Sequence, residues 1–308
     1  MKDIKIGTRG SKLALWQAYY IQDRLQENGI TSEIIVIETK GDKILDRSLS
    51  KIGSKGVFTE ELEEKLLSGE IDIAVHSAKD LQSSLGDKFE IIAFTPRETT
   101  NDVLVSHDKT LSMKSGKDFV IGTSSTRRIA TLKSLYPHIK TVDMRGNLQT
   151  RLKKMEDGHC DALLLAYAGV HRMEYDDKIA ELLPLDEFTP AVGQGTVAVE
   201  CAKSLDAERK DKIRQATNDP FTEICLKTER AFLKKLEGGC SIPVFGLATL
   251  VDEQIWFRGG IINLDGTKVI RKETRGAMDQ AEALGFALAV ELLEAGAKEI
   301  LAEIKGQL

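Results

Sequence analysis

IDIAVHSAKDL, residues 71–81, changes from apolar to polar directly after Val75. The apolar half is typical of a buried strand of a parallel sheet. In open α/β sheets, ligands bind just beyond the carboxyl ends of the strands. Ser77, Lys79 and Asp80 therefore form a candidate site, where a carboxylate could stabilise a cation while an ammonium group binds an anion. The alternative is a solvated loop with an ordinary surface pair of lysine and aspartate.

Composition limits the class of protein. A length of 308 residues predicts two or three domains, and 42% hydrophobic residues suffice to bury their cores. The net charge of −5 argues against a nucleic-acid-binding protein, which is usually basic. The start, MKDIKIGTRG, has no apolar signal segment, and no run approaches the ~20 apolar residues of a membrane span. We therefore expect a cytoplasmic protein without membrane or nucleic-acid partners.

The cysteines give neither a metal pattern nor a disulfide pattern. They are Cys160, Cys201, Cys225 and Cys240. None belongs to a C-x-x-C pair, and their spacing agrees with a reducing compartment. Cys240 follows two glycines, which would give a bulky group access to its sulfur. The alternative for this residue is a buried free cysteine.

The first part of the chain alternates short apolar runs with helical patterns. Strands are predicted at residues 2–6, 34–37, 71–75 and 90–95. A helix begins at Lys12, and a second helix runs from an N-cap at Thr59 to Ser68. This order predicts a parallel sheet with right-handed crossovers.

A polar segment, residues 96–102, separates a second unit that repeats this logic. Its strands are predicted at residues 119–121, 140–144 and 161–166, and a strand at 196–200 is expected to return to the first sheet. A third unit follows, with a helix from Asp219 or Thr222 to Glu237. Its further elements are antiparallel strands at 244–251, 254–262 and 268–273 and helices at 279–295 and 298–304.

These patterns predict an α/β fold with two doubly wound domains and a C-terminal α+β domain. The C-terminal domain contains a three-stranded antiparallel sheet. The predicted domains are residues 1–96 plus 195–216, residues 97–194, and residues 217–308.

Two strand-to-helix turns are candidate anion sites. The turn at residues 7–11 offers free backbone N–H groups, a helix dipole and the fork of Arg9. In the turn at residues 122–128, Arg127 and Arg128 open a helix. Arginines at a helix start oppose the helix dipole, which disfavours a purely structural role. An anion between the two guanidinium groups would remove this conflict.

Three further arginines lie close to predicted strand ends. Arg145 and Arg172 each follow a strand, and Arg151 lies a helical turn beyond the first of them. A single arginine in such a place is more often part of a surface salt bridge. Six arginines at matching topological positions indicate a ligand with many carboxylates. His171, beside Arg172, is predicted to be a structural or rim residue.

Residues 38–56 carry four lysines and three glycines but little apolar periodicity. A loop of this length inside a compact domain is unusual and is often functional. We predict a mobile basic lid; the alternative is an ordinary surface loop.

Seven motifs resemble those of the porphobilinogen deaminase (hydroxymethylbilane synthase) family, from one end of the chain to the other. They are GTRGSKLALWQA, GDKILDRSLSKIGSKGVF, DIAVHSAKD, GTSSTRR, RGNLQTRL, PAVGQGTVAVEC and LEGGCSIPV. The resemblance implies a monomer of three domains, the first two similar to type II periplasmic binding proteins.

The resemblance also implies a reaction and its residues. Family members are transferases of tetrapyrrole biosynthesis that join four porphobilinogen units head to tail and release ammonia. The growing oligopyrrole is built on one covalent dipyrromethane cofactor per chain, and no metal is implied. By resemblance, Asp80 is the catalytic carboxylate and Cys240 carries the cofactor through a thioether.

The remaining implied residues fall into three groups. The cofactor-binding residues are Ser77, Lys79, Asp80, Thr123, Ser124, Ser125, Arg127, Arg128 and Arg145. The substrate-binding residues are Arg9, Ser11, Arg145, Arg151 and Arg172. The lid residues are Lys51, Lys55 and Phe58.

The sequence departs from the family pattern at two places. Leu81-Gln82 and residues 97–103 lack prolines that family members commonly have there, but neither change removes a chemical group. Two other functions are alternatives to this enzyme activity. A non-catalytic small-anion-binding protein would not explain the Gly-Gly-Cys motif, and a phosphoryl-transfer enzyme would require a Walker motif that is absent.

Overall fold

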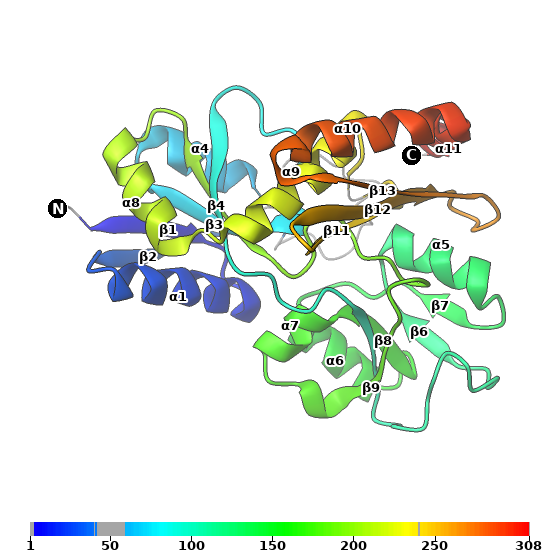
Figure 1. The fold of residues 1–308 in the computed structure, drawn as a ribbon. Helices are drawn as coiled ribbons and strands as arrows, with labels where there is room; N and C mark the ends of the chain where they lie inside the picture. The colour runs from blue at the N-terminus through cyan, green and yellow to red at the C-terminus, as the bar shows by residue number, and fades with distance from the viewer. Residues whose placement is uncertain (1–2, 40, 42–58, 240, 308) are drawn as a thin grey trace.

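The structure is a computed structural model that describes residues 3–39, 41, 59–239 and 241–307. Within these residues the strands form three sheets, each with its own helices (Figure 1). The first two sheets are mixed α/β units, and the third is a C-terminal three-stranded antiparallel sheet. The predicted fold class is therefore confirmed.

The first sheet has the strand order β2-β1-β3-β10-β4. Its strands are β1 (Ile4–Thr8), β2 (Ser32–Val36), β3 (Ile73–Ser77), β4 (Phe89–Phe94) and β10 (Val197–Ala202). β1 pairs parallel with β2 and β3, whereas β10 pairs antiparallel with β3 and β4. The predicted parallel pairing is confirmed for β1, β2 and β3, and β10 lies in the first sheet as expected, in a direction that the sequence did not predict. That strand arrives from the second unit and enters between β3 and β4.

The second sheet repeats this arrangement in the order β7-β6-β8-β5-β9. Its strands are β5 (Asp102–Val105), β6 (Val120–Gly122), β7 (Lys140–Val142), β8 (Ala162–Ala166) and β9 (Ile179–Leu182). β6 pairs parallel with both neighbours, and β5 pairs antiparallel with β8 and β9. The sequence missed β5, which opens with the charged Asp102 at the end of a polar segment, and β9, a strand of four residues at the edge of the sheet.

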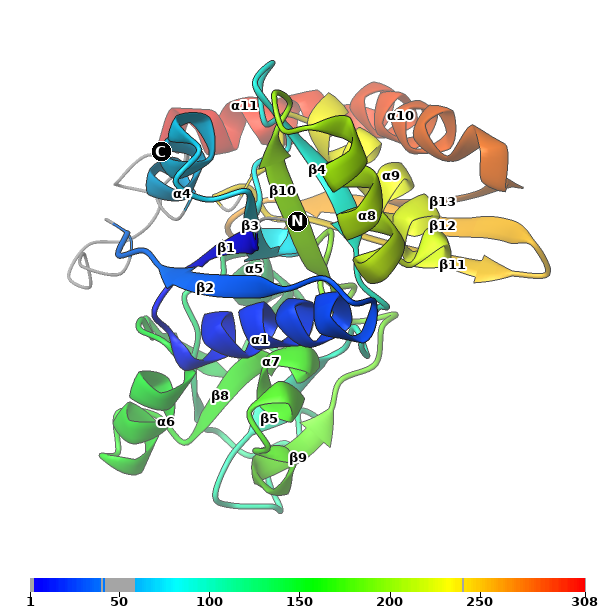
Figure 2. The ribbon, with the colours of Figure 1, turned by 90° about the vertical axis from the view of Figure 1, so that its left-hand side faces the viewer.

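Helices cover both faces of the first sheet (Figure 2). On one face, α1 (Lys12–Glu27) and α8 (Ala207–Thr217) share a core with the side chains of Ile73 and Val75. On the other, α4 (Glu60–Ser68) packs with Ala74, whose side chain points the opposite way along β3. The two helix starts differ. Ser11 caps α1 by accepting a hydrogen bond from the Ala14 N–H at 3.3 Å, whereas the predicted cap Thr59 makes no such bond.

Three helices cover the second sheet in the same manner. They are α5 (Thr126–Leu135), α6 (Leu148–Glu156) and α7 (Tyr167–Arg172). α5 packs through Leu132 on the face that carries Leu104 and Leu164. α6 and α7 pack on the opposite face, where Leu163 and Leu165 lie. Each sheet is thus buried on both sides, so the ends of its strands are where polar groups can gather.

The C-terminal unit packs helices against a meander of three strands. The strands are β11 (Val244–Val251), β12 (Gln254–Ile262) and β13 (Val269–Ala277), and the helices are α9 (Pro220–Lys235), α10 (Ala281–Leu292) and α11 (Lys298–Gln307). The predicted helix start is confirmed, since Asp219 caps α9 by accepting from the Thr222 N–H at 2.6 Å. α10 crosses α9 so closely that a Cβ on Gly285 would lie 2.0 Å from the carbonyl oxygen of Thr228.

Two segments cross between the first and second sheets, and a buried ion pair fixes both to the C-terminal unit. Arg97, in the first crossing, donates to the carboxylate of Glu229 on α9 at 2.5 and 3.2 Å. Its Nε also donates to the carbonyl of Gln194 in the second crossing at 2.9 Å. Glu229, which is fully buried, accepts a further bond from the Gly193 N–H at 2.8 Å. One carboxylate therefore joins the two crossings to α9.

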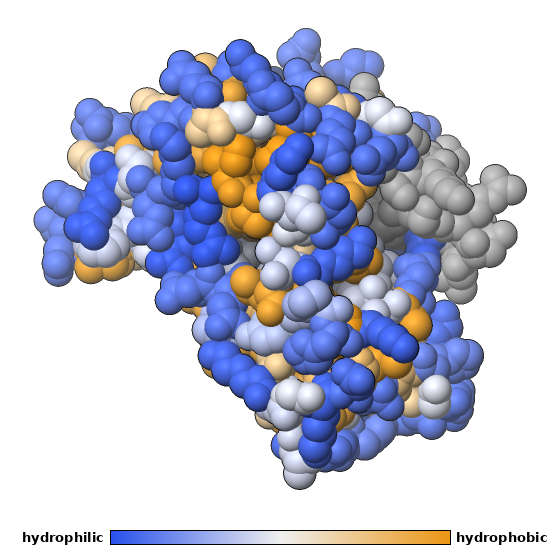
Figure 3. All heavy atoms as spheres, turned by 90° about the vertical axis from the view of Figure 1, so that its right-hand side faces the viewer, coloured by the Kyte–Doolittle hydropathy of each residue, from blue (hydrophilic) through white to orange (hydrophobic). Residues whose placement is uncertain are grey.

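Two further observations concern the whole molecule. No helix in the described ranges is both long and apolar enough to cross a membrane. Figure 3 shows one side of the molecule, where hydrophilic residues cover most of the surface. The largest group of apolar residues on this side lies in the upper half of the view. The domain boundaries at residues 97, 195 and 217 stay a prediction, although β10 does lie in the first sheet.

We expect Glu229→Gln to lower the free energy of unfolding by about 3 kcal/mol, because it leaves the charge of Arg97 buried without a carboxylate. Thermal and urea unfolding followed by circular dichroism measure the change. Glu208→Gln is the matched control, since it removes a carboxylate from an ion pair with Lys212 on the surface of α8. A Glu229 variant as stable as the Glu208 variant would contradict the structural role of the buried pair.

Candidate active site

A cavity of about 630 Å³ lies between the first two sheets. The first sheet and its helices contribute Arg9, Ser11, Gln17, Ser77, Lys79 and Asp80. The second contributes Ser124, Arg128, Arg145, Arg151 and Arg172, and the second crossing contributes residues 193–196. All five predicted substrate-binding residues line the cavity. The strand-end positions that the sequence singled out thus come together in space.

A short turn places Asp80 at the cavity. β3 ends at Ser77, and a 3₁₀ turn spans Ala78–Asp80. The Ala78 N–H donates to the carbonyl of Thr196 at 2.9 Å, which anchors the turn to the second crossing. Gly193 has a φ of 80°, and a Cβ there would lie 2.9 Å from the backbone nitrogen of Lys79. Only glycine therefore allows the crossing to pack against this turn.

Lys79 lies in the electric field of charges from both units, and Ser77 is held by α1. Burial lowers the pKa of the Lys79 ammonium; Asp80 opposes this shift, and Arg128 across the cavity adds to it. The Ser77 hydroxyl accepts a hydrogen bond from the amide of Gln17 at 2.8 Å. The turn therefore presents the exposed carboxylate of Asp80 beside a cation whose charged form is destabilised by burial.

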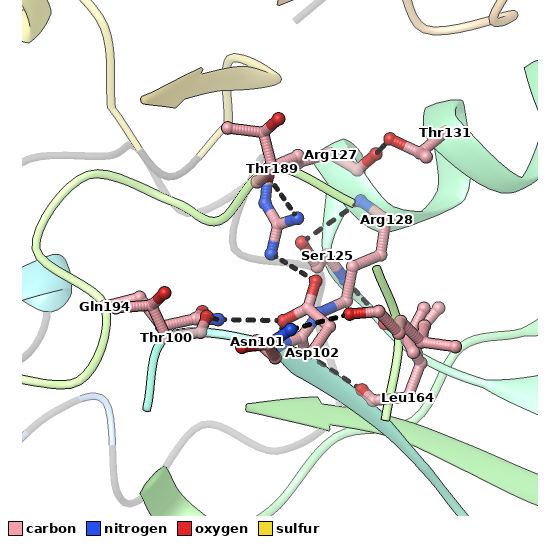
Figure 4. Close-up of polar contacts among 12 residues, drawn as sticks. Thr100, Asn101, Asp102, Ser125, Arg127, Arg128, Thr131, Leu164, Thr189 and Gln194 are labelled. Atoms are coloured by element: carbon pink, nitrogen blue, oxygen red, sulfur yellow. Dashed lines mark hydrogen bonds and ion pairs between the residues drawn. The ribbon is translucent and has the colours of Figure 1, made fainter. Parts of the chain in front are cut away.

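The two arginines at the start of α5 converge on a carboxylate of the chain itself (Figure 4). Arg127 Nη2 lies 2.8 Å from Asp102 Oδ2, and Arg128 Nη2 lies 2.7 Å from Asp102 Oδ1. Gln194 also donates to Asp102 Oδ1, at 3.0 Å. Burial alone would raise the pKa of Asp102, but the two guanidinium groups outweigh it and hold the pKa well below its usual range. The anion that the sequence predicted between Arg127 and Arg128 is therefore internal.

The internal pairing divides the predicted cofactor-binding residues. Ser77, Lys79, Asp80, Ser124, Arg128 and Arg145 line the cavity. Thr123, Ser125 and Arg127 lie behind its wall: Ser125 caps α5 by accepting from the Arg128 N–H, and Arg127 donates to the carbonyl of Thr189 at 3.0 Å. The guanidinium group of Arg127 therefore binds groups of the protein itself, Asp102 and Thr189. Arg128 shares the carboxylate but also faces the cavity.

The other lining arginines are partly fixed by backbone carbonyls. Arg151 Nε donates to Gly146 at 2.8 Å, and Arg172 Nη2 donates to Gly195 at 2.7 Å. Burial lowers the pKa of Arg151 to about 10, with Arg128 acting in the same direction and Asp80 against it. His171 is half-exposed and pairs with Asp176 at 2.9 Å, as expected of a rim residue.

The lining residues fit a ligand that carries several carboxylates. Nη1 of Arg145 and Nε of Arg128 are buried, with no hydrogen-bond partner in the described part of the chain. Among the residues that the structure describes, five arginines and a lysine line the cavity, together with two carboxylates, Asp80 and Glu38. Such a wall offers donors to carboxylates, and Asp80 offers an acceptor to N–H groups. A dipyrromethane carries both kinds of group.

Some predicted residues cannot be placed. Cys240, Lys51, Lys55 and Phe58 lie outside the described residues, so the attachment point and the lid stay predictions. The other cysteines are buried, and burial raises the pKa of Cys201 and Cys225 to about 12. The ranges that the structure describes contain no cluster of His, Cys, Asp or Glu able to hold a metal ion.

Sequence reasoning missed three residues of the site. Gln17 lies four residues before Ile21, so a polar residue on the buried face of a helix was a usable signal. Gln194 lies within the PAVGQG motif, from which no role for its side chain was predicted. Asp102 gave no local signal, because its partners are 25 and 26 residues away and belong to another element.

Comparison with known proteins gives a consistent result along the chain. Residues 4–210 match the family model "Porphobilinogen deaminase, dipyromethane cofactor binding domain", and residues 223–294 match "Porphobilinogen deaminase, C-terminal domain". The porphobilinogen deaminase of Cytophaga hutchinsonii is 60% identical over 99% of this chain and 97% of that protein. That of Desulfosudis oleivorans is 54% identical over 99% of both chains. A solved VFT2 domain of BvgS from Bordetella pertussis aligns with 69% of this chain and 85% of that domain, at 19% identity and a TM-score of 0.44.

We expect Asp102→Asn to lower the thermal midpoint at pH 7, because two buried guanidinium groups lose their carboxylate. The pKa of Asp102 in the folded state lies below its value of about 3.9 in the unfolded chain. Its contribution to stability is therefore complete above about pH 4 and is lost as the pH falls towards the folded-state pKa. Calorimetry of both proteins should show their midpoints approaching each other below pH 4. A difference that stays constant down to pH 2 would contradict this account.

Proposed function

The chain belongs to the porphobilinogen deaminase family, and we propose that its cavity carries out the hydroxymethylbilane synthase reaction. In this reaction four porphobilinogen molecules are joined head to tail on a dipyrromethane cofactor, and ammonia is released at each step. The observation that carries the proposal is the position of Asp80, an exposed carboxylate in a cavity lined by five arginines.

The arginines would bind the carboxylates of the substrate. Each porphobilinogen carries an acetate and a propionate, so each ring brings two negative charges into the cavity. Guanidinium groups bind carboxylates with paired, directional hydrogen bonds. Arg9 would act from the first sheet, and Arg145, Arg151 and Arg172 from the second. Contacts from both sides would fix the ring in one orientation, which is what a reaction between two rings requires.

Asp80 would act on the charge that develops during the reaction. As ammonia leaves porphobilinogen, positive charge develops on the pyrrole and its N–H becomes a stronger donor. A fixed carboxylate that accepts this hydrogen bond stabilises the transition state more than the ground state. The turn held by Thr196 and Gly193 keeps Asp80 in place for this role. Burial lowers the pKa of Lys79 beside it, so carboxylates of a ligand would stabilise the charged form of this ammonium group.

The cofactor, when bound, supplies the terminal pyrrole carbon that attacks the substrate. Ser77, Lys79, Ser124, Arg128 and Arg145 would hold it, since each lines the cavity. Arg127, Thr123 and Ser125 would support this wall from behind. Cys240 would carry the thioether, and the buried, weakly acidic thiols of Cys201 and Cys225 support this choice among the cysteines.

The proposal extends to residues 42–58 and to the state of the protein. Lys51, Lys55 and Phe58 would belong to a lid over the cavity, and the chain would act as a cytoplasmic monomer on porphobilinogen and the growing oligopyrrole. The net charge of −5 supports the expectation that no nucleic acid is bound. A non-catalytic anion-binding protein is not favoured, because such a protein does not need an exposed carboxylate among its arginines.

We expect Asp80→Asn to fold normally and to lose turnover by a factor of about 10² to 10³, as for the loss of one group that stabilises transition-state charge. Porphobilinogen consumption measured with cofactor-loaded enzyme tests this. Asp87→Asn removes an exposed carboxylate shortly after the same turn and is the matched control. Near-normal turnover of the Asp80 variant would exclude the proposed role.

We expect Cys240→Ser to purify without a covalent pyrrole group, because a serine hydroxyl cannot form the thioether. Intact-mass measurement should show the mass of the polypeptide alone, and Ehrlich's reagent should give no pyrrole colour. Cys225→Ser, which changes a buried cysteine, should keep both the added mass and the colour. An added mass that persists in the Cys240 variant would place the attachment elsewhere.

A further inference from the structure

Helices from the first and second sheets meet beside the cavity. α1 of the first unit and α7 of the second lie side by side (Figures 1 and 2). At this junction the guanidinium carbon of Arg172 lies 5.1 Å from the ring centroid of Trp16. Nη2 of Arg172 also donates to the carbonyl of Gly195 at 2.7 Å. Arg172 is therefore held by three parts of the chain: α7, which carries it, α1 and the second crossing.

A guanidinium group can make two kinds of contact. An aromatic ring contacts its planar face, whereas carboxylates bind its edge, where the N–H groups lie. Within the described ranges Arg172 makes no ion pair with a carboxylate, and it lines the cavity. One of these N–H groups donates to Gly195, and within the described residues the others remain available to a ligand.

Trp16 is itself held in a fixed orientation. Its ring stacks on Tyr20 of the same helix, with centroids 5.5 Å apart and an interplanar angle of 7°. It is half-buried and is not among the residues that line the cavity. A ring in this place does not touch a ligand, but it can restrict the side chain that does.

We propose that Trp16 is a positioning residue, which holds the guanidinium group of Arg172 across the junction of α1 and α7 in the orientation that a substrate carboxylate requires. The proposal rests on the proposed function, in which Arg172 binds porphobilinogen. A free arginine must give up rotamer freedom when it binds a ligand, and an arginine already held by a ring and a carbonyl gives up less. Trp16 therefore acts on binding and not on the chemical step.

The first experiment compares Trp16→Leu, Trp16→Phe and Tyr19→Leu in cofactor-loaded enzyme. Tyr19→Leu removes an exposed aromatic residue three positions further along α1 and is the matched control. Cation–π contacts with tryptophan are the strongest of their kind, and those with phenylalanine are weaker. We expect Trp16→Leu to raise KM for porphobilinogen about fivefold with kcat within a factor of two. Trp16→Phe should recover most of the loss, and Tyr19→Leu should behave as the unmodified enzyme.

The second experiment asks whether Trp16 acts through Arg172. In an Arg172→Met background no cation lies beside the ring of Trp16, so Trp16→Leu should raise KM by less than a factor of two. A fivefold effect that persists in this background would overturn the proposal. Equal KM values for the leucine variant and the unmodified enzyme would overturn it as well, as would a fall in kcat at constant KM.

These outcomes are separate from those that test the proposed function. If the unmodified, cofactor-loaded enzyme consumes no porphobilinogen, the proposed function fails and Trp16 has no reaction to assist. If it is active and only the Trp16 variants behave otherwise than expected, the positioning role alone is excluded. Thermal midpoints of all variants show whether a change in KM comes from misfolding, and Trp16→Phe keeps the test decisive if the leucine variant is unstable.

Discussion

Two buried guanidinium groups at one helix start require a carboxylate, and Asp102 supplies it. The desolvation of each cation costs several kcal/mol, which only close pairing and further hydrogen bonds can offset. Asp102 meets this requirement with three donors: Arg127, Arg128 and Gln194. Because it is the first residue of β5, it also ties the start of α5 to the second sheet. Gln194 extends the same cluster into the second crossing, so the neutralisation of charge determines how the wall of the cavity is built.

The pair of Arg97 and Glu229 extends this arrangement to the C-terminal unit. Its carboxylate receives an N–H from Gly193, and Gly193 packs on the backbone of Lys79. A chain of contacts therefore leads from α9, through the second crossing, to the turn that carries Asp80. On the other side the same crossing reaches Asp102 and, through it, Arg128. The position of Asp80 relative to the arginines opposite is thus set by buried ion pairs rather than by the loops themselves.

This explains which features could be predicted from the sequence. Most helices and most strands followed from local patterns, although α7 and α8 were not predicted. The arginines of the cavity followed from a topological rule that places strand ends at one edge of a sheet. Pairing between distant segments left no such trace. β10 was expected in the first sheet, but its antiparallel direction was not. Asp102 looked like part of a polar linker, because the two arginines that neutralise it lie in another element. For the same reason the sequence predicted that Arg127 binds a ligand, whereas its guanidinium group binds Asp102 and Thr189.

The distribution of charge around the cavity separates three tasks. Burial lowers the pKa of Lys79 and of Arg151, because nearby charges of the protein, Asp80 among them, offset the loss of hydration only in part. Inside the wall, Asp102 shows what full compensation does, since its own pKa is held far below the usual range. At the surface of the cavity the corresponding carboxylates would come from the ligand. Among the described residues Asp80 has no ion pair with these arginines, and it keeps its exposure to the cavity. Structural charge is thus neutralised from within and binding charge by the ligand, which leaves one carboxylate available for the charge that arises in the reaction.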